Sequence, residues 1–280
     1  SDSTGPVYIT EYYAATTATE TTAGGVEGYF HQSSVQQGEL GTPVLQSHTE
    51  YYARHIQGKS AYPTANYTVY RNTDGTGAET TSYAYTWIPN TLQTQTTIVS
   101  LPVVSTAQNG SGTANTSTTV YDSFGRVTWT KDAEGFLTYM AYDDATGAVV
   151  KMITDVDTTE TGDFTDLPSG WSTPSGGGAH LITQYEVDSL GRTVKTTDAN
   201  GVVSYTVYRD DEYTDSGTGA KITGEVRTYP NWDNTTHAPN GPISISRTIV
   251  VGDSQFSEYL AVSVSPSLDG SNEPTGLETF

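Results

Sequence analysis

The stretch Tyr121-Asp-Ser-Phe-Gly-Arg126 returns 66 positions later as Val187-Asp-Ser-Leu-Gly-Arg192. The residues that follow each copy repeat as well. The pairs that coincide in one ungapped register include Asp122/Asp188, Gly125/Gly191, Arg126/Arg192, Asp132/Asp198, Gly135/Gly201, Tyr139/Tyr205 and Tyr142/Tyr208. Self-similarity at a fixed offset is typical of structural units arranged in an array.

The spacing inside each copy predicts turns and strands. The two Asp-x-x-Gly segments, 132–135 and 198–201, indicate tight turns, because Asp caps its own backbone and Gly accepts a positive φ. The runs between such turns, for example 126–131 and 136–142, are rich in β-branched and aromatic residues. The sequence therefore predicts an all-β fold of consecutive antiparallel hairpins.

The repeated residues are interpreted as structural. Arg126 and Tyr142 fall just inside the two ends of one predicted hairpin, where a guanidinium can stack on a ring or bond a loop carbonyl. We expect the repeated side chains to hold each unit together. The residues given this role are Tyr121, Asp122, Gly125, Arg126, Asp132, Gly135, Tyr139, Tyr142, Asp188, Gly191, Arg192, Asp198, Gly201, Tyr205 and Tyr208.

These motifs resemble the YD-repeat family, also called Rhs repeats, whose unit contains Tyr-Asp-x-x-Gly-Arg. The segment 121–126 matches in full, 187–192 matches without its Tyr, and 142–148 keeps Tyr-Asp and Gly but has Ala148 in place of Arg. The resemblance is specific over 120–211 and weak over 67–87. It implies hairpins that wind into a spiral sheet forming part of a hollow shell, as in insecticidal toxin complexes, bacterial Rhs toxins and teneurins.

Composition limits the partners and the compartment. With 28 Gly, 20 Tyr and only 2 Met the chain has a turn-rich and aromatic profile, and it has no Cys, which suits an exported bacterial protein at the cell surface or outside the cell. The formal charge of −20 makes nucleic acid and anionic membranes poor partners. No apolar run is long enough to span a bilayer, so membrane insertion is not expected.

We interpret residues 1–280 as one continuous β-rich segment, a fragment of a longer chain. Its clearest repeats are 120–155 and 187–211, and its insertion loops are 158–179 and 229–242, both rich in Pro or Gly. The stretch 44–57 leaves two alternatives open, a helix with apolar residues every fourth position or a strand. Its Thr and Tyr residues favour the strand.

No catalytic residue is assigned. The five histidines show no metal-binding spacing, and Gly252-Asp-Ser254 lacks the remainder of a serine hydrolase motif. Rhs proteins carry an aspartyl protease motif of the type Asp-Pro-x-Gly. Here Asn272-Glu-Pro-Thr-Gly276 has Glu273 in place of that Asp, so the activity is not carried over.

Calcium is the one ion that the acidic loops suggest. Asp155 with Asp157, and Asp210 with Asp211, place hard oxygen ligands close together on loops, although a solvated acidic loop is the favoured interpretation. No other cofactor is expected.

The sequence suggests two kinds of contact with carbohydrate, covalent glycosylation and glycan binding. Asparagines in N-x-S/T sequons are candidate glycosylation sites, and tryptophans in the insertion loops are candidate stacking platforms for a glycan. The residues concerned are Asn66, Asn109, Asn115 and Asn234, and Trp171 and Trp232.

The function that these observations favour is a non-catalytic architectural segment, part of a β-shell or a cell-surface scaffold, whose partners are other segments of the same long chain or copies of itself. A carbohydrate-binding or adhesive module is the alternative. A glycan-active enzyme is third, because it needs two convergent carboxylates that the sequence does not single out.

Overall fold

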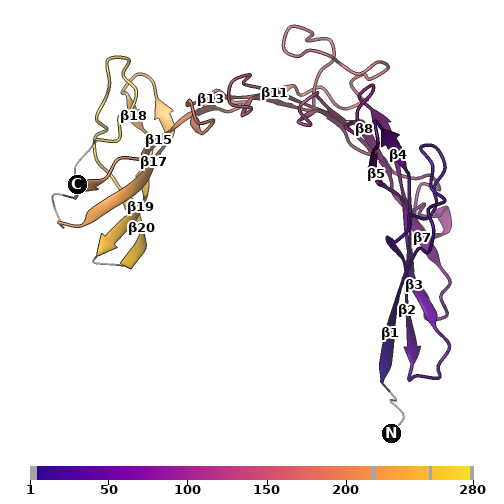
Figure 1. The fold of residues 1–280 in the computed structure, drawn as a ribbon. Helices are drawn as coiled ribbons and strands as arrows, with labels where there is room; N and C mark the ends of the chain where they lie inside the picture. The colour runs from indigo at the N-terminus through magenta and orange to yellow at the C-terminus, as the bar shows by residue number, and fades with distance from the viewer. Residues whose placement is uncertain (1–4, 216–218, 252–253, 278–280) are drawn as a thin grey trace. The chain divides into compact units, whose positions relative to one another are not determined.

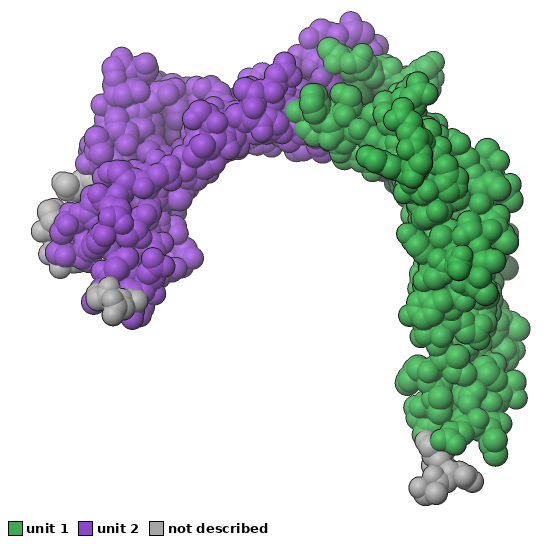
Figure 2. All heavy atoms as spheres, in the orientation of Figure 1, with its two compact units in different colours: residues 1–138, 165–177 green, residues 139–164, 178–280 purple. Residues whose placement is uncertain are grey.

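The computed structural model describes residues 5–215, 219–251 and 254–277. These residues form an all-β fold of 20 strands with one short 3-10 helix, η1 (Thr106–Gln108). The predicted fold class, consecutive antiparallel hairpins, is confirmed. The chain divides into two compact units, residues 1–138 with 165–177 and residues 139–164 with 178–280 (Figure 2).

Unit 1 is an antiparallel ladder of long strands joined mostly by short connections. Its order is β1–β2–β3–β6–β7–β8–β9–β10, and β4 and β5 form a separate small hairpin (Figure 1). The strands are β1 (Pro6–Tyr12), β2 (Phe30–Gln37), β3 (Val44–Tyr51), β4 (Arg54–Ile56), β5 (Lys59–Ala61), β6 (Thr64–Tyr70), β7 (Ala78–Trp87), β8 (Thr94–Ser100), β9 (Thr116–Tyr121) and β10 (Val127–Lys131).

The stretch that left helix and strand open is extended in the structure. It forms β3 and β4, so the strand interpretation is confirmed. The loop between β1 and β2 packs on the end of β3, where Ala18 and Val26 join Tyr51 and Ala53 in a small buried cluster. Much of this unit is therefore a single polar sheet with a local second layer.

Unit 2 contains a second antiparallel ladder, with the order β12–β13–β14–β15–β17–β19–β20, while the short strands β16 and β18 pair with β17. The strands are β12 (Val149–Thr154), β13 (Leu181–Val187), β14 (Thr193–Thr197), β15 (Val203–Arg209), β16 (Tyr213–Thr214), β17 (Lys221–Asp233), β18 (Ala238–Pro239), β19 (Ile243–Val251) and β20 (Ser254–Val262). The strand β11 (Leu137–Tyr142) begins in unit 1 and continues into unit 2.

The main core of unit 2 lies where β15, β17 and β19 are adjacent. It consists of Val203, Tyr205, Tyr229, Trp232, Ile243 and Ile245, with Val207, Leu260, Val262 and Val264 packed against it. Along β15 and β19, period-2 alternation places the core residues on one face and Ser204, Thr206, Ser244 and Ser246 on the other.

The two predicted turns have the same geometry. The Gly135 N–H donates to the Asp132 carbonyl at 3.2 Å, and the Gly201 N–H donates to the Asp198 carbonyl at 2.9 Å. Both glycines have positive φ, +95° and +79°. Every residue of 120–155 and 187–211 is described, and none is helical, as the repeat interpretation requires.

Candidate functional site

The repeated Asp-x-x-Gly-Arg segment folds as a turn fastened by its own aspartate. In the first copy, Asp122 Oδ1 accepts the backbone N–H groups of Phe124 (2.8 Å) and Arg126 (2.9 Å). Its other oxygen, Oδ2, accepts Arg126 Nε at 2.7 Å. One carboxylate thus closes the turn and holds the arginine that leads into β10.

The second copy repeats this arrangement. Asp188 Oδ1 accepts the N–H groups of Leu190 and Arg192 at 2.9 Å each, and Arg192 Nε lies 2.7 Å from Asp188 Oδ2. The Arg192 guanidinium also lies 4.3 Å from the Tyr208 ring centre and donates to Asp210 at 2.8 Å. The Arg192 guanidinium thus stacks on a repeat tyrosine, the Arg126 guanidinium lies 4.8 Å from the Phe124 ring centre, and each arginine binds the carboxylate of its own turn.

The electrostatics of these turns favour charged carboxylates. Burial alone would raise the pKa of Asp122, but hydrogen bonds from Arg126 and Phe124 outweigh it and the pKa is lowered. The same balance lowers the pKa of Asp188. The hydrogen bond from Arg192 lowers the pKa of Asp210. Such groups are poor general acids near neutral pH, because they hold no proton to donate.

A further turn of this kind was missed by sequence reasoning. Asp269 Oδ1 accepts the N–H groups of Ser271 (2.8 Å) and Glu273 (3.0 Å), and Asn272 takes the positive-φ position at +62°. The stretch that was compared with a protease motif is therefore the end of an aspartate-fastened turn. The signal was present as Asp-x-x-Asn, because Asn tolerates the left-handed region that Gly takes in the other copies.

A row of charged side chains lies across four neighbouring strands of unit 2. Direct cross-strand partners on β15, β17, β19 and β20 alternate in sign, in the order Arg209, Glu225, Arg247 and Glu258. Arg247 Nε donates to Glu258 at 2.5 Å, and an Arg209 guanidinium nitrogen lies 4.0 Å from a Glu225 oxygen. We call these four residues the charge row. Opposite charges on directly opposed residues stabilise strand pairing.

Glu225 and Arg247, the two middle residues of the charge row, are buried and also bind side chains outside the row. The Glu225 residue is 3% exposed, and its carboxylate accepts Arg227 Nε at 2.6 Å and the Tyr213 hydroxyl at 2.5 Å. Arg247 also pairs with Asp215 at 2.9 Å. Burial and the neighbouring Glu225 raise the pKa of Tyr213. Removing one member of such a network would leave a buried charge without compensation, which destabilises the fold.

The carboxylates predicted to bind calcium make protein contacts in the structure. The Asp155 carboxylate accepts the N–H groups of Gly178 (2.8 Å) and Ala179 (2.9 Å), and Asp157 accepts the Thr159 N–H at 2.9 Å. Asp210 and Asp211 pair with arginines. Within 5–215, 219–251 and 254–277, no group of three or more His, Asp or Glu side chains is arranged to hold a metal ion. Calcium binding stays a prediction.

The two tryptophans proposed as glycan platforms lie in different surroundings. Trp232 is 5% exposed and packs edge-on against Tyr205 (5.2 Å between ring centres) and Tyr229 (6.0 Å), so its ring is part of the core. Trp171 is half-buried. It packs edge-on against Trp129 at 6.4 Å and lies under the Lys131 ammonium at 4.9 Å.

The sequon asparagines differ in access. Asn66 lies on β6, half-buried, and donates to the Glu50 carboxylate at 2.9 Å. Asn109, Asn115 and Asn234 are exposed in loops. Of the serine hydrolase tripeptide, Gly252 and Asp253 lie outside the described residues.

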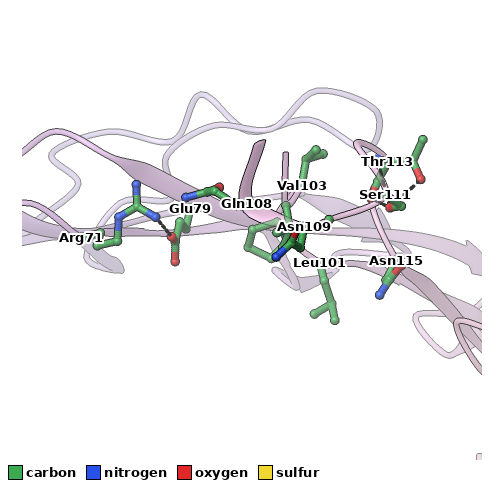
Figure 3. A pocket seen from close by; sticks show the side chains of 12 residues that line it. Arg71, Glu79, Leu101, Val103, Gln108, Asn109, Ser111, Thr113 and Asn115 are labelled. Atoms are coloured by element: carbon green, nitrogen blue, oxygen red, sulfur yellow. Dashed lines mark hydrogen bonds and ion pairs between the residues drawn. The ribbon is translucent and has the colours of Figure 1, made fainter. Parts of the chain in front are cut away.

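An open groove of about 720 Å³ lies in unit 1 beside the loop that follows β8. Figure 3 shows the Arg71–Glu79 ion pair (3.0 Å) at one side and Leu101, Val103 and Gln108 nearby. None of the described residues that line the groove is aromatic or a histidine. The groove thus offers aliphatic surface and amides, without a nucleophile and base in contact.

Three solved structures illustrate what the chain is similar to. They are crystal structures of TcdB2-TccC3-Cdc42 (11% identity, TM-score 0.35) and TcdB2-TccC3-TEV (14%, 0.36), and a structure of the Photorhabdus luminescens Tc holotoxin pore (13%, 0.33). The alignments cover 96%, 88% and 92% of this chain. The chain spans 15%, 12% and 15% of those much longer chains.

No family model matches the chain, and no curated protein matches it. Among the described residues, no helix is long and apolar enough to cross a membrane.

Proposed function

We propose that this chain is a non-catalytic architectural segment of an exported bacterial YD-repeat protein, part of a β-shell or a cell-surface scaffold. Its partners are then other strands of the same long chain or of neighbouring chains, and it works outside the cell. The absence of cysteine in the sequence fits an exported protein that folds without redox chemistry.

The observation that carries the proposal is that the charged side chains contact turns and neighbouring strands of the same sheet. The motif residues with the most distinctive chemistry, Asp122 with Arg126 and Asp188 with Arg192, fasten turns at the ends of strands. The charge row lies within the sheet, and its members are direct partners across neighbouring strands. Because these side chains hold the turns and strands together, the repeated motif is explained without a substrate.

A pair of matched variants tests the proposal. Asp122→Ala removes an acceptor of three hydrogen bonds from one turn, whereas Asp144→Ala changes an exposed aspartate in the adjacent hairpin. We expect Asp122→Ala to lower the melting temperature clearly and Asp144→Ala to leave it nearly unchanged.

Assays of the unmodified chain on polysaccharide and ester substrates, and on a panel of immobilised glycans, complete the test. The proposal predicts no turnover and no specific glycan binding. Turnover that one carboxylate substitution abolishes at unchanged melting temperature would support an enzyme instead. Glycan binding that Trp171→Ala abolishes would support the carbohydrate-binding alternative.

A further inference from the structure

The strand β20 ends the ladder of unit 2 and pairs with β19 alone among the strands of the described residues. The pairing runs without a register shift through all nine residues, Ser254 to Val262. The second edge of β20 therefore presents a regular series of backbone N–H and C=O groups. Regular edges of this length readily accept another strand.

Natural sheets usually protect such edges, and β1 in unit 1 shows how. That strand begins at Pro6, which has no N–H to donate, and its pairing with β2 is shifted between Glu11 and Tyr12. The strand β20 has neither device. It contains no Pro and no Lys, and Glu258 is its single charged residue. The free edge of β1 is thus protected against strand addition, whereas the free edge of β20 is not.

The side chains of β20 carry further information about a partner. Phe256 is 57% exposed and Tyr259 is 77% exposed, and they lie on opposite faces of the strand. Glu258 shares the face of Phe256 and is 34% exposed, although it accepts Arg247 Nε. The strand therefore offers an aromatic ring on each face and one carboxylate at its centre.

The charge row predicts what should lie opposite that carboxylate. Across four strands the directly opposed residues alternate Arg209, Glu225, Arg247 and Glu258, and the alternation stops at Glu258 because the strands stop there. A fifth strand that continues the order has a cation at this position. An anion would meet Glu258 as a like charge directly opposite, which destabilises strand pairing.

We propose that the free edge of β20 is a docking site for an extended basic segment, which adds as a further strand with Lys or Arg opposite Glu258. Two positions from that cation, on the same face, the segment carries an apolar residue against Phe256, because Phe256 and Glu258 are two residues apart. The net charge of −20 attracts a basic segment from a distance.

A second copy of the chain is the less suitable occupant. Both molecules would carry the same charge of −20, and a second β20 would bring another glutamate rather than a cation. The inference deepens the proposed function, on which it rests, by naming one edge and the chemistry of the strand that binds there.

Three synthetic peptides, added to the full chain, provide the test. Each has the length of β20 and alternates Thr with Val. The first has Arg at its centre, the second has Glu there, and the third is the Arg peptide with alternate backbone N-methyl groups, which cannot extend a sheet. Amide hydrogen exchange read by mass spectrometry reports which strand is protected, and calorimetric titration gives the affinity.

We expect the Arg peptide to slow exchange in 254–262 and to leave 6–12 unchanged, with an affinity that falls as salt is added. The Glu peptide should bind about tenfold more weakly or worse. The N-methylated peptide should not bind. In Glu258→Lys the preference between the Arg and Glu peptides should invert.

Because Glu258→Lys also places a second cation beside Arg247, Glu258→Gln serves as the milder variant. It keeps an acceptor for Arg247 and should make the two peptides bind equally well. Protection of β20 by neither peptide, equal binding of both to the unmodified chain, or protection of β20 by self-association at low ionic strength without any peptide would each overturn the inference. Failure of this kind leaves the effect of Asp122→Ala on melting unaltered, so it is distinguishable from failure of the proposed function.

Discussion

A single carboxylate decides the geometry of each repeat turn. Asp122 accepts two backbone N–H groups and the Arg126 guanidinium, whose side chain is about three-quarters buried. Arg126→Ala should lower the free energy of unfolding by about 1.5–3 kcal/mol, the range for a hydrogen bond to a charged group. Chemical denaturation measures it. Arg126→Lys is the control, because Lys keeps the charge without the planar fork and should restore only part of the loss.

A second residue-scale prediction concerns His48, which packs against Tyr13 and His31 in unit 1. Its ring lies 5.2 Å from that of His31, and its Nε2 lies 3.4 Å from the Tyr13 hydroxyl. Burial lowers the pKa of His48 below 6.5. The neighbouring Glu50 acts in the opposite direction, and His31 lowers the pKa further. The unfolded chain therefore binds a proton at higher pH than the folded one. We expect the stability contributed here to be complete above pH 6.5 and to fall as the pH is lowered through the folded pKa.

Urea denaturation at a series of pH values between about 5 and 7.5 measures this effect. His48→Gln should flatten the profile in that interval. His55→Gln, at an exposed histidine on β4, should leave it as in the unmodified chain. A free energy of unfolding that increases as the pH is lowered would contradict the direction predicted for His48.

At the scale of the element, the hairpin turns depend on one backbone conformation. Gly201 has φ +79° and open space around its missing Cβ, so conformation alone limits substitution there. Gly201→Ala should cost about 1 kcal/mol or more. Gly201→Asn should cost less, because Asn272 already occupies the equivalent position in the Asp269 turn. The control is Gly224→Ala, within β17, where φ is not positive and space is also open. Thermal unfolding ranks the three.

Packing between strands gives a second prediction at this scale. Trp232 closes the core formed by β15, β17 and β19 and is almost fully buried. Trp232→Ala should lower the free energy of unfolding by about 3–5 kcal/mol, the range for a large aromatic residue removed from a core. Trp171→Ala should cost clearly less, because that ring is half-buried. Equal and small losses at both positions would contradict the core role of Trp232.

Sequence reasoning succeeded where the signal was local. The turns at 132–135 and 198–201, the strands between them and the strand at 44–51 follow from alternation and from Asp and Gly at fixed offsets. It failed where partners are far apart in the chain. The charge row joins residues of four strands. The sequence next to Arg209 or Arg247 does not indicate which residues lie opposite them on the neighbouring strands. The prediction of an insertion loop over 229–242 is wrong at its start, because residues up to Asp233 form the end of β17 and Trp232 reaches the core from there.

For the whole molecule, charge and sheet edges act in opposite directions. The chain has 32 acidic and 12 basic residues, so copies repel one another at low ionic strength, while the unprotected edge of β20 favours strand addition. Screening limits the repulsion to roughly 8 Å at physiological ionic strength, and calcium can also bridge carboxylates. We therefore expect self-association to rise with salt, and to rise at lower concentration with calcium.

Light scattering across sodium chloride and calcium chloride titrations at matched ionic strength measures this association. Ser257→Lys places a cation next to Glu258 on the opposite face of β20, adds a charge to the edge strand and should reduce association without altering the core. Thr10→Lys is the matched control on β1, an exposed position of the strand that begins with proline, and should have little effect. A chain that stays monomeric at every salt and calcium concentration would contradict this prediction, because the edge of β20 would then not accept a second copy even when charge is screened.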